Sequence, residues 1–294
     1  MKLNRYLFLV IAMLLSLVSK AQNQALPNFD IVMFKLEQNK GEYYLAQPQI
    51  VANRPDYDNQ PAFSADDKTI YFTHMENNKT DIWQWSLDSK QAKVLHETSL
   101  SEYSATLIPD TNNEISVIRV EEDQTQRLWK FNQKGEFTVI FEDVKPVGYH
   151  AWNDDNVAMF ILAEPNELHI AKAGQNTSTK LDQNIGRCIQ RIPDSNQFSY
   201  TVIENERHML KSITMDGATK KSLFSLPSDT QDYVWLNNNQ VISSDGNKLY
   251  IRDINDKSGW KKIKNSTNFK ISKISRLAIS NNKTMLAVVV EKQR

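Results

Sequence analysis

Residues 59–73 read NQPAFSADDKTIYFT, and a little further on residues 80–85 read TDIWQW. In this stretch Ala62 and Phe63 precede a cluster of Ser and Asp, which is followed by a run of β-branched and aromatic residues. Ser and Asp favour tight turns, and β-branched and aromatic residues favour strands. The pattern therefore predicts two strands joined by a turn, with a third strand after them.

The same segment recurs along the whole chain. Further copies read TLIPD at 106–110, AWNDD at 151–155, QRIPD at 190–194, VWLNN at 234–238 and AISNN at 278–282. The equivalent residues are Phe63, Leu107, Trp152, Arg191, Trp235 and Ile279, and their spacings are 44, 45, 39, 44 and 44 residues. One four-stranded blade of a β-propeller takes about 40 to 50 residues. The spacing therefore predicts six such blades.

A second repeated pattern agrees with the first. A strand-like run follows each of the first five copies: DIWQW at 81–85, RLWKF at 127–131, ELHI at 167–170, MLKSI at 209–213 and KLYI at 248–251. A polar turn and a short apolar run then follow, as in KVL at 93–95 and TVI at 138–140. Each repeat is therefore predicted to contain four strands separated by turns.

The two ends of the chain have complementary gaps in this pattern. Residues 30–34 match the third-strand pattern but have no first or second strand before them in the mature chain, whereas Ile279 is followed by only one more strand, at 285–290. We expect residues 28–51 to supply the outer strands of a blade whose inner strands lie at residues 274–292. The predicted fold is an all-β, six-bladed propeller of four-stranded antiparallel blades, closed without exposed sheet edges.

These residues resemble the TolB-type propeller family, whose WD40-like blades carry an aromatic-Ser-Pro-Asp-Gly-Lys turn and a later Asp-Ile-Trp strand. The copy at 59–83 is closest, with Ala65 in place of Pro and Asp67 in place of Gly, and the copy around Arg191 departs furthest. The resemblance covers nearly all of residues 28–294. It implies the propeller fold and leaves function open because one fold serves many functions. The α/β domain that precedes the propeller in TolB is not expected here, because only residues 22–27 separate the expected cleavage site from the first strand.

The first residues have the layout of a secretory signal peptide. A basic start is followed by a thirteen-residue apolar run at 6–18 and by small residues at Ser19 and Ala21. A membrane-spanning helix needs about 20 apolar residues, so this run is too short to span. We expect a signal peptide at 1–21 and a single propeller domain at 22–294 in the periplasm or outside the cell. An uncleaved N-terminal anchor is the alternative.

Composition argues against several classes of partner. Without Lys2, Arg5 and Lys20 the mature chain has 32 basic and 35 acidic residues, a formal charge of −3. This balance does not favour nucleic acid as a partner. Cys188 is the single cysteine, so no intramolecular disulfide can form, and a chain of this length can bury enough apolar area to be stable. We expect the protein to be a monomer.

Clusters of Asp and Asn could be taken as calcium ligands, but they all fall between the first and second strands of a repeat. Asp66-Asp67 and Asp154-Asp155 are examples. Asp and Asn are also the residues that tight turns need, and we interpret the clusters as turns. The five histidines show no zinc-type spacing, the Ser243–Gly246 segment is also turn-like, and most of the six tryptophans recur at repeat positions typical of a core. No metal, cofactor or catalytic residue is predicted.

The polar residues before each first strand are the best candidates for function. In a propeller this strand is innermost, and its beginning faces one mouth of the central channel, where binding sites commonly lie. Arginine can bind a carboxylate through two hydrogen bonds, and tyrosine offers a flat face with a hydroxyl. The alternative is that these residues form structural ion pairs. The predicted site consists of Asp58, Asn59, Glu102, Tyr103, Tyr149, His150, Arg187, Asp232, Tyr233 and Arg276.

Three functions are compatible with this pattern. The first is a binding module without catalysis, which recognises a peptide, a protein partner or a small polar ligand at the channel mouth. The second is a lactonase-type or esterase-type hydrolase that uses a metal held by Asp58, Glu102 and Asp232. The third is a scaffold whose outer faces make the contacts.

Overall fold

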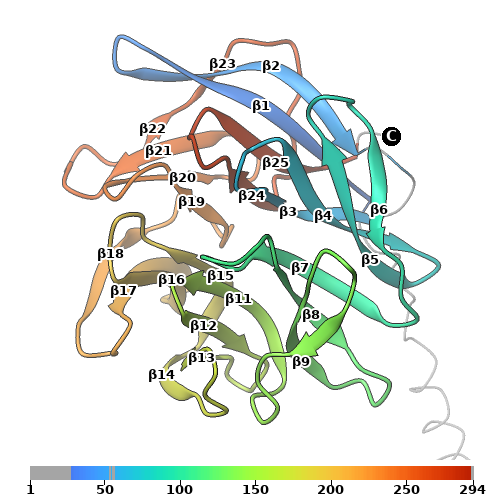
Figure 1. The fold of residues 1–294 in the computed structure, drawn as a ribbon. Coiled ribbons are helices and arrows are strands. Elements are labelled where there is room, and N and C mark those ends of the chain that lie inside the picture. Colours follow the sequence, from blue (N-terminus) through green and yellow to red (C-terminus); the bar gives the residue numbers. More distant parts are fainter. Residues whose placement is uncertain (1–27, 53, 55–56, 293–294) are drawn as a thin grey trace, which may run out of the picture.

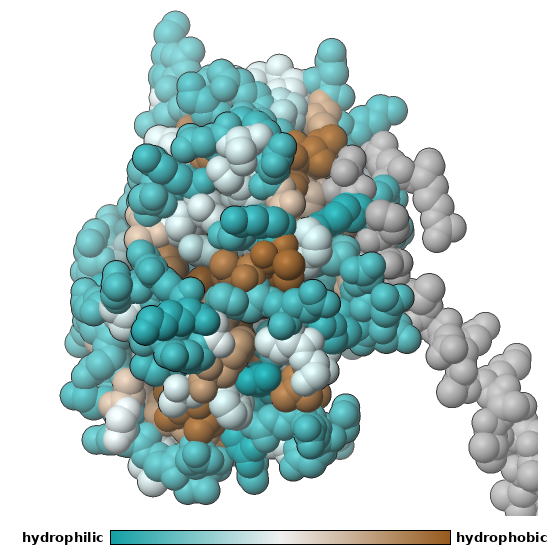
Figure 2. Space-filling model, turned by 45° about the vertical axis from the view of Figure 1, so that its right-hand side comes forward, coloured by the Kyte–Doolittle hydropathy of each residue, from teal (hydrophilic) through white to brown (hydrophobic). Residues whose placement is uncertain are grey.

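The computed structural model describes residues 28–52, 54 and 57–292; the predicted signal peptide lies outside them. The described residues contain strands and turns and no helix, so this part of the chain is all-β as predicted (Figure 1). No helix among them could cross a membrane. One face of the molecule is mostly hydrophilic, with hydrophobic residues gathered in a few patches (Figure 2).

Four sheets each contain four antiparallel strands that follow one another along the chain. The first comprises β7 (Ser101–Leu107), β8 (Ile115–Val120), β9 (Gln126–Phe131) and β10 (Phe137–Val139). The second comprises β11 (Val147–Asn153), β12 (Asn156–Ile161), β13 (Glu167–Lys172) and β14 (Thr179–Gln183). The third comprises β15 (Ile185–Arg191), β16 (Gln197–Glu204), β17 (Arg207–Thr214) and β18 (Lys220–Ser225). The fourth comprises β19 (Tyr233–Trp235), β20 (Gln240–Ser244), β21 (Leu249–Asp253) and β22 (Lys261–Lys262).

The remaining strands form a nine-stranded sheet made of two four-stranded runs. One run is β3 (Tyr57–Phe63), β4 (Thr69–Glu76), β5 (Lys79–Ser86) and β6 (Ala92–His96). The other run is β24 (Arg276–Ile279), β25 (Met285–Glu291), β1 (Phe29–Asn39) and β2 (Glu42–Ala52), with β23 (Lys264–Asn265) pairing in parallel at the edge of β2. A single parallel pair, Phe29 with Tyr57, joins the two runs. Below, each run of four antiparallel strands is called a unit.

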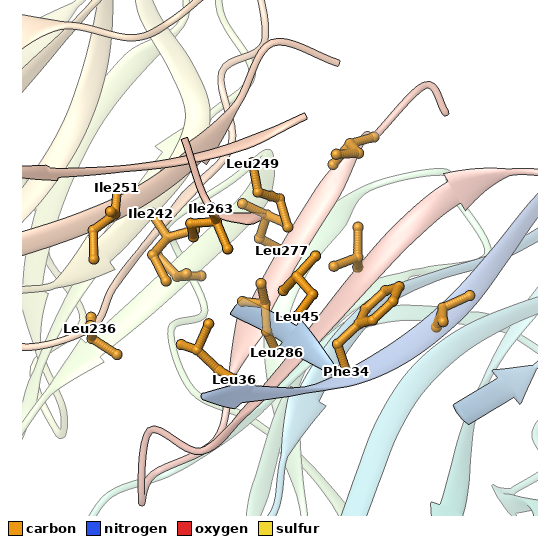
Figure 3. Packing of buried hydrophobic residues seen from close by; sticks show 14 of the residues in the cluster. Phe34, Leu36, Leu45, Leu236, Ile242, Leu249, Ile251, Ile263, Leu277 and Leu286 are labelled. Carbon is orange, nitrogen blue, oxygen red and sulfur yellow. The ribbon is translucent and has the colours of Figure 1, made fainter. Parts of the chain in front are cut away.

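The first and last strands of the described chain pair with each other, as predicted. β1 and β25 are antiparallel, with Ile31 opposite Val289 and Phe34 opposite Leu286. Successive side chains of a strand point to opposite faces, and both faces of this pair are buried. Phe34 and Leu286 join one hydrophobic cluster, which includes Leu45 and Leu277, while Ile31 and Val289 join another (Figure 3).

The turns between first and second strands explain the recurring Asp and Asn residues. Asp67, Asp110, Asp154 and Asp194 all have positive φ, between 53° and 58°, which Asp and Asn tolerate better than most residues. The interpretation of these clusters as turns is therefore confirmed. The Asp67 carboxylate also accepts hydrogen bonds from the backbone N–H groups of Asn281, at 2.7 Å, and Asn282, at 2.8 Å, which links the turns of two neighbouring units.

The first strands of the units contact one another in a cycle. β3 contacts β7 and β24, β11 contacts β7 and β15, and β19 contacts β15 and β24. These strands therefore surround the centre of the molecule, and the residues at their beginnings are brought together there.

Candidate binding site at the centre

A cavity of about 110 Å³ lies among the first strands, and every unit contributes to its wall. The lining includes Gln60 of β3, Ser104 of β7, Tyr149 and His150 of β11, Arg187 and Cys188 of β15, Asp232 just before β19, and Arg276 of β24. Residues spread over more than 200 positions of the chain therefore share one small space.

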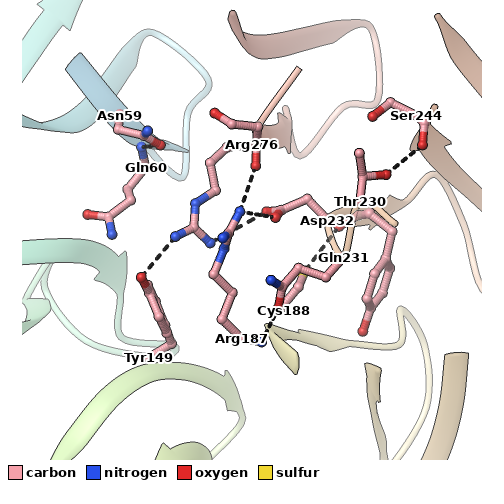
Figure 4. A network of polar contacts seen from close by, with 12 residues as sticks. Asn59, Gln60, Tyr149, Arg187, Cys188, Thr230, Gln231, Asp232, Ser244 and Arg276 are labelled. Carbon is pink, nitrogen blue, oxygen red and sulfur yellow. Dashed lines mark hydrogen bonds and ion pairs between the residues drawn. The ribbon is translucent and has the colours of Figure 1, made fainter. Parts of the chain in front are cut away.

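Two arginines share one carboxylate in this cavity. Arg187 Nη2 donates to Asp232 Oδ2 at 2.7 Å, and Arg276 Nη1 lies 3.5 Å from Asp232 Oδ1 (Figure 4). The side chains of Asp232 and Arg276 are only 9% and 12% exposed, whereas that of Arg187 is 30% exposed. Burial, the largest single influence, lowers the pKa of the Arg276 guanidinium, but Asp232 and the other groups around it together raise that pKa above its ordinary value.

Tyr149 lines the cavity beside Arg276, and Tyr103 packs against Tyr149. Arg276 Nη2 donates to the Tyr149 hydroxyl oxygen at 3.0 Å, and the guanidinium carbon lies 4.8 Å from the centre of the Tyr149 ring. Tyr103 meets Tyr149 edge-on, with 6.2 Å between ring centres, and its hydroxyl donates to Gln126. Burial raises the pKa of Tyr103, so this phenol stays neutral.

The backbone around Arg187 is held in place by a residue of the next unit. The Arg187 N–H donates to Gln231 Oε1 at 2.7 Å, and Arg187 Nη2 also donates to the Ser275 carbonyl oxygen at 3.0 Å. A Cβ at Gly186 would lie 2.9 Å from Gln231 Oε1 and 2.2 Å from Thr201 Oγ1. A glycine is therefore needed for β15 to approach its neighbours this closely.

The cluster has more hydrogen-bond donors and positive charge than its own acceptors use. Two guanidinium groups face one carboxylate, which leaves a net charge of +1. Arg187 Nε and Ser275 Oγ are buried and have no hydrogen-bond partner among the described residues. Such donors around a positive centre suit an anionic oxygen group.

Asp58 and Asn59 lie on β3, but their side chains bond to residues outside the arginine cluster. Asp58 is fully buried, and its Oδ1 lies 2.9 Å from Arg54 Nη2 and 2.8 Å from His74 Nδ1. The Asn59 side-chain oxygen accepts the Gln60 N–H at 2.7 Å. These two residues therefore do not join the arginine cluster.

Glu102 is also engaged elsewhere. Its carboxylate accepts the Thr98 hydroxyl at 2.8 Å and lies 3.1 Å from Arg119 Nε. Burial raises the pKa of Glu102 to about 7, although the Thr98 hydroxyl and Arg119 favour the charged form. Glu102 is therefore part of a buried pair between β7 and β8.

His150 and Tyr233 bind serines of a neighbouring unit. His150 Nε2 and Trp152 Nε1 lie 2.7 and 2.8 Å from the Ser116 hydroxyl oxygen. In the same way the Tyr233 hydroxyl and Trp235 Nε1 donate to the Ser199 hydroxyl oxygen, at 2.9 and 2.7 Å. Burial lowers the pKa of His150 to about 3, so the ring is neutral. Both residues hold units together, although His150 also forms part of the cavity wall.

Of the ten predicted residues, the structure brings Tyr103, Tyr149, Arg187, Asp232 and Arg276 into one cluster. The others bond elsewhere, His150 from the cavity wall itself, because alternate side chains of a strand point in opposite directions. Gln60, Gln231 and Ser275 were not among the ten predicted residues, although each adjoins one of them in the sequence. Adjacent residues of a strand point to opposite faces of the sheet. This alternation is the sequence signal that could have shown that Tyr149 and His150, or Tyr103 and Glu102, do not face the same space.

The three carboxylates considered for a metal site are not grouped. Asp58, Glu102 and Asp232 are each paired with different arginines. Within the described ranges there is no group of three or more His, Cys, Asp or Glu residues that could hold a metal ion.

Comparisons with solved structures identify the type of fold. The chain is similar to a protein assigned as TolB from Agrobacterium tumefaciens, with a TM-score of 0.68 and 11% identity over 91% of this chain and 99% of that chain. The fold is of the β-propeller type. It is also similar to TolB from Acinetobacter baumannii, with a TM-score of 0.57 and 11% identity over 90% of this chain and 64% of that one.

Other similar propellers have different roles. A chain of a nidogen–laminin complex gives a TM-score of 0.61 and 13% identity over 90% of this chain and all of that chain. An oligogalacturonate lyase from Vibrio parahaemolyticus gives 0.55 and 13% over 86% of this chain and 84% of that one. No protein-family model and no curated protein matches the sequence. At these identities the comparisons show the fold alone.

Proposed function

We propose that this chain is an exported, six-bladed β-propeller whose central cavity binds a ligand without intrinsic catalysis. The six units correspond to blades, and the cycle of contacts among their first strands together with the pairing of β1 with β25 supports a closed ring. The signal-peptide pattern of residues 1–21 supports export to the periplasm or the medium.

The observation that carries the binding proposal is the pair of arginines on one carboxylate. Arg187 and Arg276 converge on Asp232 and leave one positive charge and unused donors at the centre of the molecule. A buried ion pair alone would need one arginine, so the second points to a ligand with an anionic group. We therefore propose that the ligand is a peptide or protein segment, or a small polar molecule, that presents a carboxylate.

The similar structures support a macromolecular partner in general terms. One similar chain is part of a nidogen–laminin complex, in which a propeller occurs together with another protein. A peptide or protein of the cell envelope would meet this chain after export.

A binding experiment tests the proposal. Purified protein would be titrated calorimetrically with citrate, succinate and a library of tetrapeptides with free C-termini, each peptide paired with its C-amidated form. We expect a carboxylate-bearing probe to bind, and Arg187→Gln to weaken that binding by about tenfold or more, since a charge-assisted pair contributes about 1.5–3 kcal/mol.

Arg191→Gln is the matched control, because Arg191 lies on the same strand and its side chain is 42% exposed. It should leave both binding and folding unchanged. Equal binding of amidated and free peptides, or full binding by Arg187→Gln, would overturn the carboxylate proposal.

The alternative is a metal-dependent hydrolase, and one similar structure, an oligogalacturonate lyase in complex with manganese, is an enzyme of similar fold that holds a metal. Elemental analysis of the purified protein and assays on ester and lactone substrates distinguish the two functions. A stoichiometric metal whose removal abolishes hydrolysis would favour the enzyme.

A further inference from the structure

A second and larger cavity, of about 460 Å³, lies between the β3–β6 unit and the β7–β10 unit. It opens beside the β3–β4 and β9–β10 turns, so it lies at the opposite end of β3 from Asp58. We refer to it as the inter-unit groove. The residues that decide its chemistry are Tyr71, Gln84, His96, Asn113, Phe131 and Gln133.

The floor of the groove is apolar and fixed. Ile115 and Phe131 are buried members of one hydrophobic cluster, and Leu95 packs against them. The His96 ring meets Phe131 edge-on, with 5.0 Å between ring centres. A Cβ at Gly135, whose φ is +79°, would lie 2.9 Å from His96 Nδ1, so only glycine leaves room for the imidazole in this position.

The rim of the groove is rich in unused hydrogen-bonding groups. The side chains of Tyr71, Gln84, His96, Asn113 and Gln133 form no hydrogen bond with any residue that the structure describes. Each of the three amides has both a donor and an acceptor, and the phenol and the neutral imidazole add further groups of both kinds. The groove can therefore both give and accept hydrogen bonds along its length.

The groove offers almost no charge to a ligand. Asp66 is its one acidic lining residue, and Asp66 Oδ1 already accepts the Ser64 hydroxyl at 2.7 Å and the Lys68 N–H at 3.1 Å. Burial lowers the pKa of His96, which keeps its ring neutral near pH 7. A charged ligand would therefore lose its hydration without gaining a dedicated counter-charge.

The corresponding groove between the next two units has different chemistry. It is lined by Glu114 and Lys130, which form an ion pair at 2.8 Å, and by Asp154 and Asp155. Lys130 follows Trp129 on β9 as Gln84 follows Trp83 on β5, so the two side chains occupy equivalent positions. The neutral character of the first groove is therefore not a general property of the repeat.

We propose that the inter-unit groove binds a neutral saccharide. A sugar presents hydroxyl groups that need both donors and acceptors, and its C–H faces pack on aromatic rings such as that of the partly buried Tyr71. The volume and the mixture of apolar floor and polar rim are those of a small-molecule site. This site is separate from the central cavity and does not depend on the function proposed for it.

The proposal is tested by calorimetric titration of the purified protein with maltose, cellobiose, lactose and N,N′-diacetylchitobiose, with glucuronate and glucosamine as charged probes. We expect at least one neutral disaccharide to bind and the charged probes to bind at least tenfold more weakly. Gln84→Ala and Gln133→Ala should each weaken that binding by about three- to tenfold, since one hydrogen bond contributes about 0.5–1.5 kcal/mol.

Lys130→Ala, at the equivalent position of the next groove, is the matched control and should leave saccharide affinity unchanged. Gln133 is exposed, so its substitution tests the site even if Gln84→Ala lowers stability. Failure of all four disaccharides to bind, stronger binding of a charged probe, or full affinity in both glutamine variants would overturn the proposal. Carboxylate binding at the central cavity should persist in these variants, which separates the two proposals.

Discussion

Asp232 is the residue on which the central cluster depends. It lies directly before β19, between arginines from β15 and β24, and its carboxylate is the acceptor that the two guanidinium groups share. A buried charge without a partner is costly, so a pair or triad of this kind is sensitive to the loss of one member.

We predict that Asp232→Asn destabilises the protein by about 3 kcal/mol, because Arg276 stays buried without a full counter-charge. Urea unfolding followed by tryptophan fluorescence measures this change. Asp154→Asn is the control, because Asp154 pairs at 3.4 Å with Arg191 and both side chains are well exposed. The control should cost less than about 1 kcal/mol, and equal effects of the two substitutions would contradict the prediction.

His150 gives the stability a pH dependence with a defined sign. Its pKa is about 3 in the folded chain, against an ordinary value of 6.5, because burial disfavours the charged ring. Between these values the unfolded chain binds a proton that the folded chain does not, so stability falls as pH falls below 6.5. At pH 5 this effect lowers the free energy of unfolding by about 2 kcal/mol relative to its value above pH 6.5, at about 1.4 kcal/mol per pH unit.

We therefore predict that His150→Gln reduces the difference in unfolding free energy between pH 7 and pH 5 by about 2 kcal/mol. A glutamine amide can still bond to Ser116, so the variant should fold. Urea titrations of both proteins at several pH values provide the measurement. An unchanged pH dependence in the variant would show that His150 is protonated in the folded chain.

At the scale of the elements, the same hydrogen-bonding arrangement joins two pairs of neighbouring units. In each, the hydroxyl of a serine on a second strand forms hydrogen bonds with two side chains from the first strand of the next unit. Ser116 on β8 bonds to two residues of β11, and Ser199 on β16 bonds to two residues of β19. The tryptophans at 152 and 235 are thus both core residues and hydrogen-bond donors. Their repeat position indicated core packing, and the hydroxyl that receives each indole N–H is a tertiary feature.

We predict that Ser199→Ala costs about 1–3 kcal/mol, because it leaves the Tyr233 hydroxyl and the Trp235 N–H buried without an acceptor. Ser222→Ala on β18 is the control, since Ser222 is exposed, and it should have little effect. Differential scanning calorimetry measures both variants. Equal melting temperatures for Ser199→Ala and the unsubstituted protein would show that the hydroxyl bridge contributes nothing.

Most elements could be predicted from local patterns, because a strand, a turn and the next strand each follow from neighbouring residues. The turns at Asp67 and Asp154 are examples, as are β5 and β9. The parallel pairing of β23 with β2 could not be predicted, since two residues carry no periodicity and their partner lies more than 200 positions away. The same holds for the direction in which each polar residue of a first strand points.

At the scale of the whole molecule, the two ends of the described chain, at residues 28 and 292, lie where the other units have a hairpin. Phe29 is opposite Glu291 in the antiparallel pair of β1 and β25, so the end of β25 adjoins the beginning of β1. In the other units the second and third strands are joined by a turn, such as the one at residues 121–125 between β8 and β9.

We predict that a circular permutant folds if a short linker joins residue 292 to residue 28 and the chain is opened between Asp123 and Gln124. Both residues of the new opening are exposed, and exposed turns tolerate such changes. Its unfolding free energy should lie within about 2 kcal/mol of that of the natural chain, since the same contacts form in both. Circular dichroism and urea unfolding test this.

A permutant opened inside β25, between Ala287 and Val288, is the control and should not fold, because both residues are fully buried in a central pair of strands. If the first permutant is unfolded, or if both fold equally well, the pairing of the termini does not have the structural role assigned to it.

The sequence by itself determined the all-β class, the four-stranded repeat and the pairing of the terminal strands, because these follow from a regular spacing and from periodic apolar residues. It also placed polar residues before each first strand. Only the tertiary structure decided which of them meet. Arg187, Arg276, Asp232, Tyr149 and Tyr103 share one cluster. Glu102 pairs with Arg119 of its own unit, whereas His150 and Tyr233 bond to serines of a neighbouring unit. The physical reason is that neighbouring residues determine whether a segment forms a strand. The twist of the sheets and the approach of distant strands determine where each side chain points and which partner it reaches.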